Sequence, residues 1–196
     1  MENFESIYNA VWEKLELGAR PEGSDYHIPT IATVEDGRPH PRSVVMRSAD
    51  RANRVIGFHT DARSPKVRRL QKNPSVGWHF YSRADKTQIC LQTIATVHVN
   101  DELTNGIFTE MPARCKRVYL APNPPSKEHD QFVTNVAPGL EDRMPTDEEA
   151  EAGRKNFAVV RCEVVEIDWL YLLFEGHRRA RFQWNGTKFD SCWLSP

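Results

Sequence analysis

The stretch R-S-V-V-M-R at residues 42–47, followed by F-H-T-D-A-R-S-P-K at residues 58–66, decides how this chain folds. A β-branched pair between the two arginines of the first stretch is typical of a strand. In the second stretch, Ser64 and Pro65 are a common helix start, and Lys66 follows directly. Cations and the free N–H groups of a helix start can converge on one dianion. The spacing therefore predicts a phosphate site.

Composition limits the class of protein. A chain of 196 residues fits one ordinary domain, so we expect residues 1–196 to fold as a single unit with a substantial core. Hydrophobic residues make up 39% of the chain, charged residues make up 27%, and the formal net charge is -1. These values disfavour disorder and a strongly basic nucleic-acid binder. We expect a small-molecule partner and no nucleic acid.

The cysteines and the termini give further expectations. Cys90, Cys115, Cys162 and Cys192 stand far apart, with no C-x-x-C pair and no histidine spacing that completes a metal site. We therefore expect reduced thiols and no metal. The chain starts with acidic residues, and no apolar run approaches the length of a membrane span. A cytoplasmic protein without a membrane partner is expected.

The first half of the chain predicts one helix and then a series of strands. Within residues 1–20, apolar residues recur at helical spacing up to Gly18, a residue typical of a helix end. Residues 28–99 should form the core barrel strands, with a turn at residues 36–39. The strand runs are 30–34, 42–47, 55–60, 76–81 and 88–99, and the helix that Ser64 and Pro65 open should end at Asn73-Pro74.

The second half is less regular. Residues 103–120 favour a helix interrupted by a proline, and the proline-rich residues 122–145 predict a loop. Thr146 and Glu149 form a capping box for a helix that should reach about Lys155. Residues 157–196 return to strands, with a hairpin around Asn185-Gly186 whose two faces alternate between apolar and polar. Many short strands with a few helices predict a mainly β fold, an antiparallel barrel with flanking helices.

The spacing of the two arginines in residues 42–47 bears on which face of the sheet each side chain points to. Arg42 and Arg47 are five residues apart, so a regular strand would send them to opposite faces. Either a bulge re-aims one of them, or Arg42 serves the cofactor while Arg47 serves the substrate side. We prefer the second interpretation.

In this order, the motifs resemble the pyridoxamine 5'-phosphate oxidase-like FMN-binding split-barrel family. The resemblance rests on R-x-V-[VL]-x-[RK] at residues 42–47, F-x-T-[ND]-x-x-S-x-K at residues 58–66, the Asn73-Pro74 pair and Gln88 at the start of a long strand. A second block, H-R-R-A-R-F at residues 177–182, resembles the closing segment of the family. The resemblance implies an antiparallel split β-barrel that forms a homodimer, with FMN at the subunit interface.

The resemblance also implies site residues. Residues 42–47 would line the flavin and its phosphate, Lys66 would meet the phosphate, Gln88 the isoalloxazine edge, and Arg181 matches a C-terminal FMN arginine. The full set of implied cofactor residues is Arg42, Ser43, Val44, Val45, Met46, Arg47, His59, Thr60, Ser64, Lys66, Gln88 and Arg181. Arg47, His177 and Arg179 are the candidates for contacting an anionic substrate, and no side chain stands out as a proton donor or nucleophile.

Departures from the family pattern bear on activity. Pro65 replaces a family arginine, which removes one cation from the phosphate site and installs a good first residue for a helix. Where the oxidases clamp a substrate phosphate, this chain has Ile107, Met111 and Cys115, which cannot do so. Pyridoxamine phosphate is therefore a doubtful substrate for a divergent member of this kind.

Three functions stay open. The first is an FMN-dependent oxidoreductase that moves a hydride between a small organic substrate and the flavin. The second is a non-catalytic flavin-binding module that carries or senses FMN. The third keeps the barrel but binds haem or a deazaflavin, with His59 and His79 as conceivable haem ligands. The phosphate chemistry at Lys66 favours FMN over the third.

Overall fold

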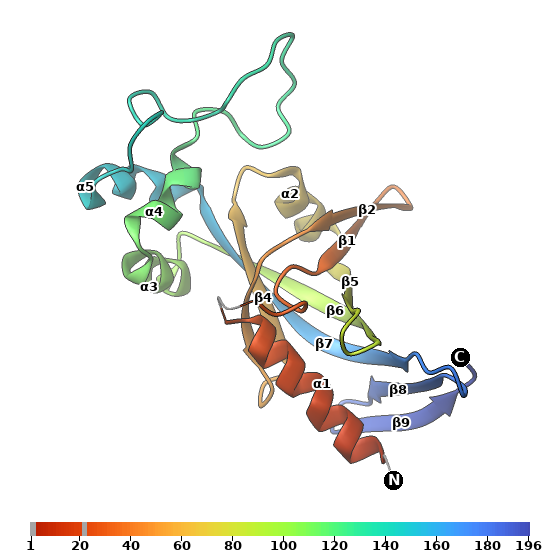
Figure 1. Cartoon of the computed structure of the whole chain (residues 1–196). Helices are drawn as coiled ribbons and strands as arrows, with labels where there is room; N and C mark the ends of the chain where they lie inside the picture. Colours follow the sequence, from red (N-terminus) through yellow and green to blue (C-terminus); the bar gives the residue numbers. More distant parts are fainter. Residues whose placement is uncertain (1–2, 21–22) are drawn as a thin grey trace. The chain divides into compact units, whose positions relative to one another are not determined.

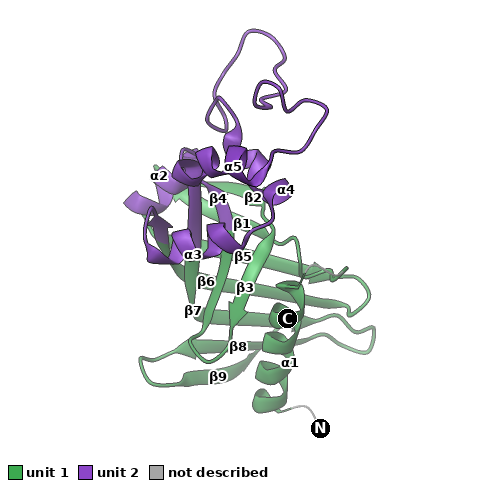
Figure 2. Ribbon diagram, turned by 90° about the vertical axis from the view of Figure 1, so that its left-hand side faces the viewer, with its two compact units in different colours: residues 1–58, 73–96, 161–196 green, residues 59–72, 97–160 purple. Residues whose placement is uncertain are grey.

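The computed structural model describes residues 3–20 and 23–196. The chain divides into two compact units (Figure 2). Unit 1 comprises Met1–Phe58, Asn73–Thr96 and Arg161–Pro196, and unit 2 comprises His59–Lys72 and Val97–Val160. We describe each unit by itself.

Unit 1 is built on an antiparallel sheet (Figure 1). Among the described residues the sheet has nine strands, of which seven follow the order β2-β1-β5-β6-β7-β4-β3, while β8 pairs with β7 and β9 off this path. The strands are β1 (Thr30–Glu35), β2 (Arg38–Ser43), β3 (Met46–Asp50), β4 (Val55–Asp61), β5 (Ser75–Ser82), β6 (Thr87–Val99), β7 (Phe157–Tyr171), β8 (Arg178–Trp184) and β9 (Phe189–Leu194). The last residues of β4 and β6 and the first of β7 belong to unit 2.

Residues 42–47 close this sheet into a barrel, and the prediction of one continuous strand there is wrong. β2 ends at Ser43 and β3 begins at Met46, although these strands stand at opposite ends of the strand order. The chain passes between them while staying hydrogen-bonded to the segment before β1. Val44 N–H donates to Pro29 O at 3.0 Å, and Met46 N–H donates to His27 O at 2.9 Å. The two ends of the sheet therefore meet at this stretch, as a closed barrel requires.

Helix α1 (Phe4–Gly18) covers part of unit 1, where the periodicity predicted a helix. Its buried side chains include Val11, Trp12 and Leu15, all fully shielded from solvent. The helix ends at Gly18, as predicted, and this glycine has a second role. A Cβ added there would lie 2.6 Å from Tyr26 O, so glycine permits a close approach of two backbone segments.

The strand core and the terminal hairpin follow the predicted alternation. Phe58, Trp78 and Leu91 are among the fully buried side chains of the barrel. In β8, Ala180 and Phe182 are buried, as the period of two required. The hairpin turn is longer than the expected two-residue turn. Trp184 pairs with Phe189, and the Asn185 side chain accepts hydrogen bonds from the next backbone N–H groups, at residues 187 and 188.

Unit 2 holds the shorter helices. The α-helices are α2 (Pro65–Lys72), α3 (Glu102–Glu110), α4 (Ala113–Lys116) and α5 (Asp147–Ala150). Two 3-10 helices follow α4 and α5 directly, η1 (Arg117–Leu120) and η2 (Glu151–Asn156). Its core is an aromatic cluster of Phe108, Tyr119 and Phe157 together with Val159. Tyr119 and Phe157 meet edge to face, with ring centroids 5.1 Å apart.

Two predictions for unit 2 can be checked at residue level. The capping box at Thr146 and Glu149 is present, but the helix tightens into 3-10 geometry at Glu151 before it reaches Asn156. Between η1 and α5, residues 121–146 contain neither helix nor strand, as the prolines predicted. Within the described ranges, no helix combines the length and apolar character needed to span a membrane.

Candidate functional site

The predicted phosphate residues in unit 2 surround one tight turn. β4 ends at Asp61 and α2 begins at Pro65, as predicted from the sequence. Ser64 N–H donates to Asp61 O at 3.0 Å, and Val67 N–H donates to Ser64 O at 3.0 Å. Ser64 is buried. The turn thus delivers the chain from a strand directly into the first turn of an eight-residue helix, whose N-terminal N–H groups favour an anion.

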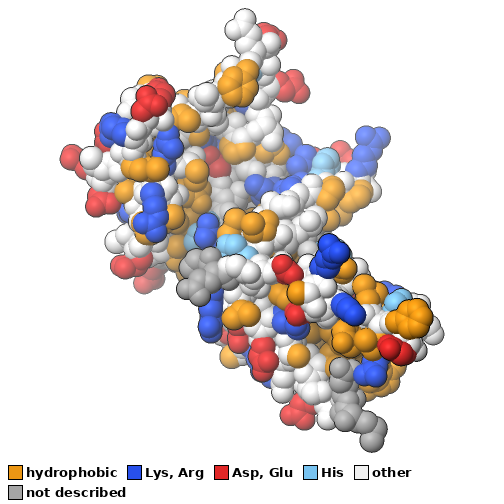
Figure 3. Space-filling model, viewed as in Figure 1, with side chains coloured by type: hydrophobic (Ala, Val, Ile, Leu, Met, Phe, Trp, Pro, Cys, Tyr) orange, Lys and Arg blue, Asp and Glu red, His pale blue; other side chains and the backbone are white. Residues whose placement is uncertain are grey.

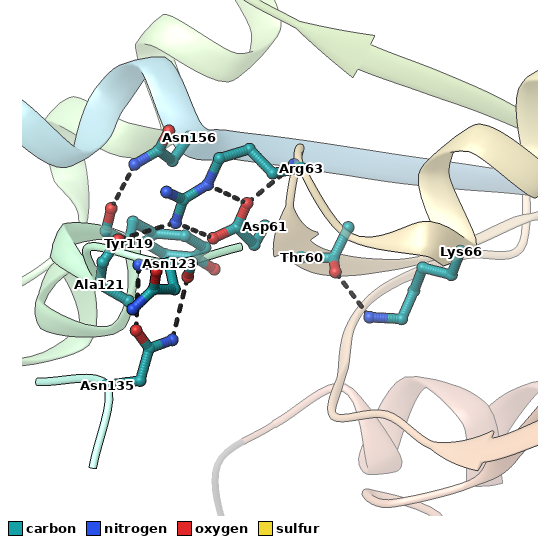
Figure 4. Close-up of polar contacts among 9 residues, drawn as sticks. All are labelled: Thr60, Asp61, Arg63, Lys66, Tyr119, Ala121, Asn123, Asn135 and Asn156. Carbon is teal, nitrogen blue, oxygen red and sulfur yellow. Dashed lines mark hydrogen bonds and ion pairs between the residues drawn. The ribbon is translucent and has the colours of Figure 1, made fainter. Parts of the chain in front are cut away.

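Lys66 and Thr60 are brought together by this turn (Figure 4). The Lys66 Nζ donates to Thr60 Oγ1 at 2.9 Å, and the Thr60 side chain is buried. A hydroxyl therefore fixes the position of the ammonium group beside the helix start. His59, the next predicted residue, lies edge to face against Phe157 with ring centroids 5.1 Å apart, which orients its half-buried ring.

Residues 42–47 lie in unit 1, and their side chains differ in solvent exposure. Arg42 is half-buried, and its Nη1 donates to Thr33 Oγ1 at 2.9 Å. Ser43 is exposed, and Val44 and Val45 are half-buried. Met46 is fully buried, so only its backbone is available to a ligand.

Arg47 is exposed at an irregular position in the sheet. Met46 pairs with Phe58 and Ser48 with Gly57, so one residue of β3, Arg47, is extra in the register. This irregularity is a β-bulge, which was the first of the two interpretations of the odd spacing between Arg42 and Arg47. A bulge re-aims a side chain, so the parity of a regular strand does not decide which way Arg47 points.

Gln88 lies near the start of β6, opposite Tyr81 of β5. Its Nε2 lies 3.7 Å from Cys90 Sγ, two residues along the same strand face. Burial raises the pKa of the half-buried Cys90 thiol, and the nearby Asp168 carboxylate adds to that rise. Cys90 is therefore a protonated thiol near neutral pH, beside the residue predicted to meet the isoalloxazine edge.

The C-terminal cations face a carboxylate that the sequence analysis missed. Arg179 donates to Asp168 through Nε at 3.0 Å and through Nη2 at 2.7 Å, a bidentate ion pair. Arg181 lies directly across from Asp168 in the β7–β8 pairing and is half-buried. The exposed His177 accepts a hydrogen bond at Nδ1 from Leu173 N–H, at 3.1 Å. Asp168 thus offsets the charge of Arg179, one of the two C-terminal arginines proposed for ligand binding.

A signal for Asp168 was present in the sequence. Pairing β7 with β8 around the chain reversal at residues 172–177 places Asp168 opposite Arg181, and this register follows from antiparallel alternation. Asp61 and Arg63 were also missed, although both lie inside the quoted stretch 58–66. Their aspartate-to-arginine spacing of two residues in a turn is the signal that could have found them.

The predicted residues therefore form two sets. Unit 1 holds residues 42–47 with Gln88, His177, Arg179 and Arg181, and unit 2 holds His59, Thr60, Ser64 and Lys66. Charges of both signs are interspersed over the face shown in Figure 3, in keeping with the net charge of -1. Among the described residues, no group of histidine, cysteine, aspartate or glutamate side chains is placed to hold a metal ion.

Comparison with known families decides what these residues belong to. Residues 9–99 match the model of the pyridoxamine 5'-phosphate oxidase, FMN-binding domain. Over this stretch, just under half of the chain, the protein is similar to the pyridoxamine 5'-phosphate oxidase-like family. FMN is accordingly its expected cofactor, and a lysine held by a hydroxyl at a helix start is suitable chemistry for the FMN phosphate. The matched stretch includes both quoted motifs and Gln88 but not residues 177–181.

Solved structures support the same fold. A pyridoxamine 5'-phosphate oxidase-related, FMN-binding protein from Nostoc punctiforme superposes with a TM-score of 0.73 at 20% identity, covering 96% of each chain. PhzG from Burkholderia lata, solved with tetrahydrophenazine-1-carboxylic acid, gives 0.68 at 17% identity, covering 98% of this chain and 92% of PhzG. A comparison with curated protein sequences gave no match. The fold is therefore the split barrel of this family, a mainly antiparallel β-sheet with a few helices.

Proposed function

We propose that this protein is an FMN-dependent oxidoreductase that transfers a hydride between a small organic substrate and the flavin. The observation that carries the proposal is the Lys66–Thr60 contact at the start of α2, inside the stretch that matches the FMN-binding domain. Bound flavin would supply the redox chemistry, and the protein would supply binding, orientation and charge.

Each set of residues has a part in this proposal. Lys66, Ser64 and the first turn of α2 bind the phosphate of FMN. In unit 1, Arg42 and the backbone of residues 43–46 would contact the flavin, and in unit 2 His59 and Thr60 would do so. Gln88 meets the edge of the isoalloxazine ring. Backbone N–H groups and cations near the ring favour the reduced, anionic flavin, which is how a protein raises the driving force for hydride uptake.

Arg47, His177 and Arg179 are the proposed substrate contacts, and their surroundings differ. Arg47 and His177 are exposed, whereas Arg179 is paired with Asp168. An ion-paired arginine attracts an anion less strongly than an unpaired one, because the carboxylate offsets its charge. We therefore assign the main attraction for an anionic substrate to Arg47.

Pyridoxamine phosphate is disfavoured as the substrate. Ile107 and Met111 occupy positions where the oxidases hold the substrate phosphate, and both side chains pack against the aromatic cluster of unit 2. Cys115, the third such position, is exposed and carries no positive charge. An apolar side chain in a core has no donor for a phosphate oxygen. We infer a substrate without a phosphate group.

We also propose a homodimer, in which Arg181 contributes to a cleft shared with the second subunit. Trp193, Tyr81 and Ile94 of unit 1 are large apolar side chains that are 50%, 49% and 44% exposed, and an isologous interface is the commonest way to cover such residues. The four cysteines are free thiols, which fits a cytoplasmic location. Light scattering of the FMN-saturated protein that gave a monomer mass would contradict the dimer.

A non-catalytic flavin carrier or sensor is the second candidate. The observation that favours it is the apolar packing of Ile107 and Met111, which leaves the substrate phosphate clamp of the oxidases unreplaced. Stopped-flow mixing of the FMN-loaded protein with NADH or NADPH separates the two. Rapid loss of the flavin absorbance, followed by reoxidation with a defined acceptor, is expected of the oxidoreductase. No reduction and no turnover across a broad panel of substrates would favour the carrier.

A further inference from the structure

The turn that holds the proposed phosphate-binding residues also contains Arg63, whose guanidinium group is bonded to a carboxylate of the same turn. Arg63 Nε donates to Asp61 Oδ1 at 3.0 Å, and its Nη2 donates to Asp61 Oδ2 at 2.7 Å. The backbone N–H of Arg63 donates to the same carboxylate at 2.8 Å. Asp61 is buried. The guanidinium charge is thus offset inside the turn, and Arg63 does not replace the cation lost at Pro65.

Arg63 reaches beyond the turn with the same nitrogen (Figure 4). Its Nη2 donates to Ala121 O at 3.0 Å, at the point where η1 gives way to the long loop. A second contact runs parallel to it: Ala62 N–H donates to Asn156 O at 2.7 Å, and Asn156 Nδ2 donates to Tyr119 O at 2.8 Å. The phosphate-binding turn is therefore fastened to the root of the loop at two neighbouring residues.

The loop itself is closed just beyond this root. Asn123 N–H donates to Asn135 Oδ1 at 3.0 Å, and Asn135 Nδ2 donates to Asn123 O at 2.9 Å. The enclosed segment carries Phe132, whose side chain is 91% exposed. The two hydrogen bonds between the Asn123 backbone and the Asn135 side chain close residues 123–135 into one lobe. The lobe begins two residues after Ala121.

We propose that Arg63 is a positioning residue that joins the phosphate-binding turn, residues 60–66, to the root of the 123–135 lobe, so that FMN occupancy and the order of the lobe are coupled. The inference rests on the proposed binding of the FMN phosphate at this turn. Coupling between two sites is reciprocal: if the phosphate orders the lobe through Arg63, an ordered lobe must strengthen FMN binding by the same factor.

The geometry separates this role from electrostatic attraction. Asp61 offsets the charge of Arg63. Loss of the hydrogen bond from Arg63 to Ala121 should therefore change the position of residues 60–66 more than the local electrostatic potential. Lys66, in contrast, is held by the Thr60 hydroxyl and would act on the phosphate through its charge as well as through its position. A lysine at position 63 keeps the charge but lacks the planar fork that contacts Asp61 and Ala121 together.

The test compares Arg63→Met and Arg63→Lys with Arg114→Met, which removes an exposed arginine from α4 of the same unit. FMN affinity is measured by quenching of flavin fluorescence at several salt concentrations. Hydrogen exchange of the peptide that spans residues 117–135 is measured with and without FMN. Thermal melting of the FMN-free proteins shows that each variant is folded.

We expect Arg63→Met to weaken FMN binding about tenfold, the value of a charged hydrogen bond, without changing the salt dependence. FMN should slow exchange in residues 117–135 of the wild type and of Arg114→Met, but not of Arg63→Met. Arg63→Lys should recover less than half of the lost binding free energy. Wild-type affinity together with wild-type protection in Arg63→Met would overturn the inference. A failure of the wild type to bind FMN would instead overturn the proposed function.

Asn135→Ala provides a second route if Arg63→Met does not fold. This variant opens the lobe and leaves the turn intact. Reciprocity requires FMN binding to weaken, by about threefold if the lost closure is worth one ordinary hydrogen bond. Unchanged FMN affinity in Asn135→Ala, with the lobe peptide exchanging freely in both the presence and the absence of FMN, would overturn the coupling.

Discussion

Lys66 Nζ lies 2.9 Å from Thr60 Oγ1, so a buried hydroxyl at the end of β4 holds the ammonium group at the first turn of α2. This contact links the two structural elements that the phosphate site requires, a strand end and a helix start. It also explains how the site can work with Pro65 in place of the family arginine. Lys66 is held in position by Thr60, so less entropy would be lost when it binds an anion.

Replacing Thr60 with valine should weaken FMN binding. The shape of the side chain is kept, but the acceptor for Lys66 is lost, and we expect a loss of about three- to tenfold in affinity, the value of one hydrogen bond to a charged group. Thr60→Ser, which keeps the hydroxyl, should bind FMN within about twofold of the wild type, since it retains this hydrogen bond. Fluorescence titration gives both values. Equal affinities for the valine and serine variants would refute the positioning role.

Replacing Arg47 with alanine should affect substrate more than cofactor. Arg47 is exposed at the bulge in β3, and we have assigned it to the substrate side of the flavin. Loss of an exposed cation should raise the KM for an anionic substrate about tenfold or more, while FMN occupancy falls by less than about twofold. Steady-state kinetics and the ratio of flavin to protein absorbance measure the two effects. Collapsed occupancy with an unchanged KM would show that Arg47 binds the cofactor.

Gly18 of α1 and Gly106 of α3 should respond to alanine in opposite directions. At Gly18 an added Cβ would lie 2.6 Å from Tyr26 O and 2.8 Å from Met46 Cε, so overpacking should lower the free energy of unfolding by about 1–3 kcal/mol. At Gly106 of α3 no heavy atom lies within 4 Å of an added Cβ. The better helix propensity of alanine should therefore raise the free energy of unfolding by up to about 1 kcal/mol. Urea unfolding measures both. Shifts of the same sign would contradict the close approach at Gly18.

The cysteines should differ in their rate of alkylation at pH 8. The thiolate is the reactive form, so a raised pKa slows the reaction. Cys115 is exposed and should react first. Burial raises the pKa of Cys90, which should react more slowly, and it raises the pKa of the fully buried Cys162 to about 12, which should leave that thiol unmodified in the folded protein. Mass spectrometry after iodoacetamide treatment gives the order, and faster labelling of Cys90 than of Cys115 would contradict it.

Much of the local structure could be predicted from the sequence because it depends on local signals. Pro65 as the first residue of α2, the capping box at Thr146 and the alternation of Ala180 and Phe182 all follow from short-range geometry, and the structure has each of them. The interruption between Ser43 and Met46 was missed because Val44 and Val45 favour strand geometry by themselves. The break is imposed by barrel closure, which depends on strands distant in sequence.

The candidate site shows the same division. Lys66 and Thr60 are six residues apart and could be placed together from the motif alone. The pairing of Arg179 with Asp168 depends on the register between two strands, and the contact of Arg63 with Ala121 spans 58 residues of chain. The β7–β8 register could be inferred from antiparallel alternation, but no local pattern places Arg63 beside Ala121. The sequence therefore carried a signal for neighbours within one short motif, such as Thr60 and Lys66, but not for the contact between Arg63 and Ala121.

The most direct test of the central claim compares FMN with riboflavin, which has the same ring system without the phosphate. Calorimetric titration of the purified protein should show binding of FMN that is at least about a hundredfold tighter than that of riboflavin, since charge-assisted contacts to a dianion supply several kcal/mol. Lys66→Met should remove most of this difference. Equal affinities for the two flavins, or no heat on adding FMN, would contradict a phosphate site at the start of α2.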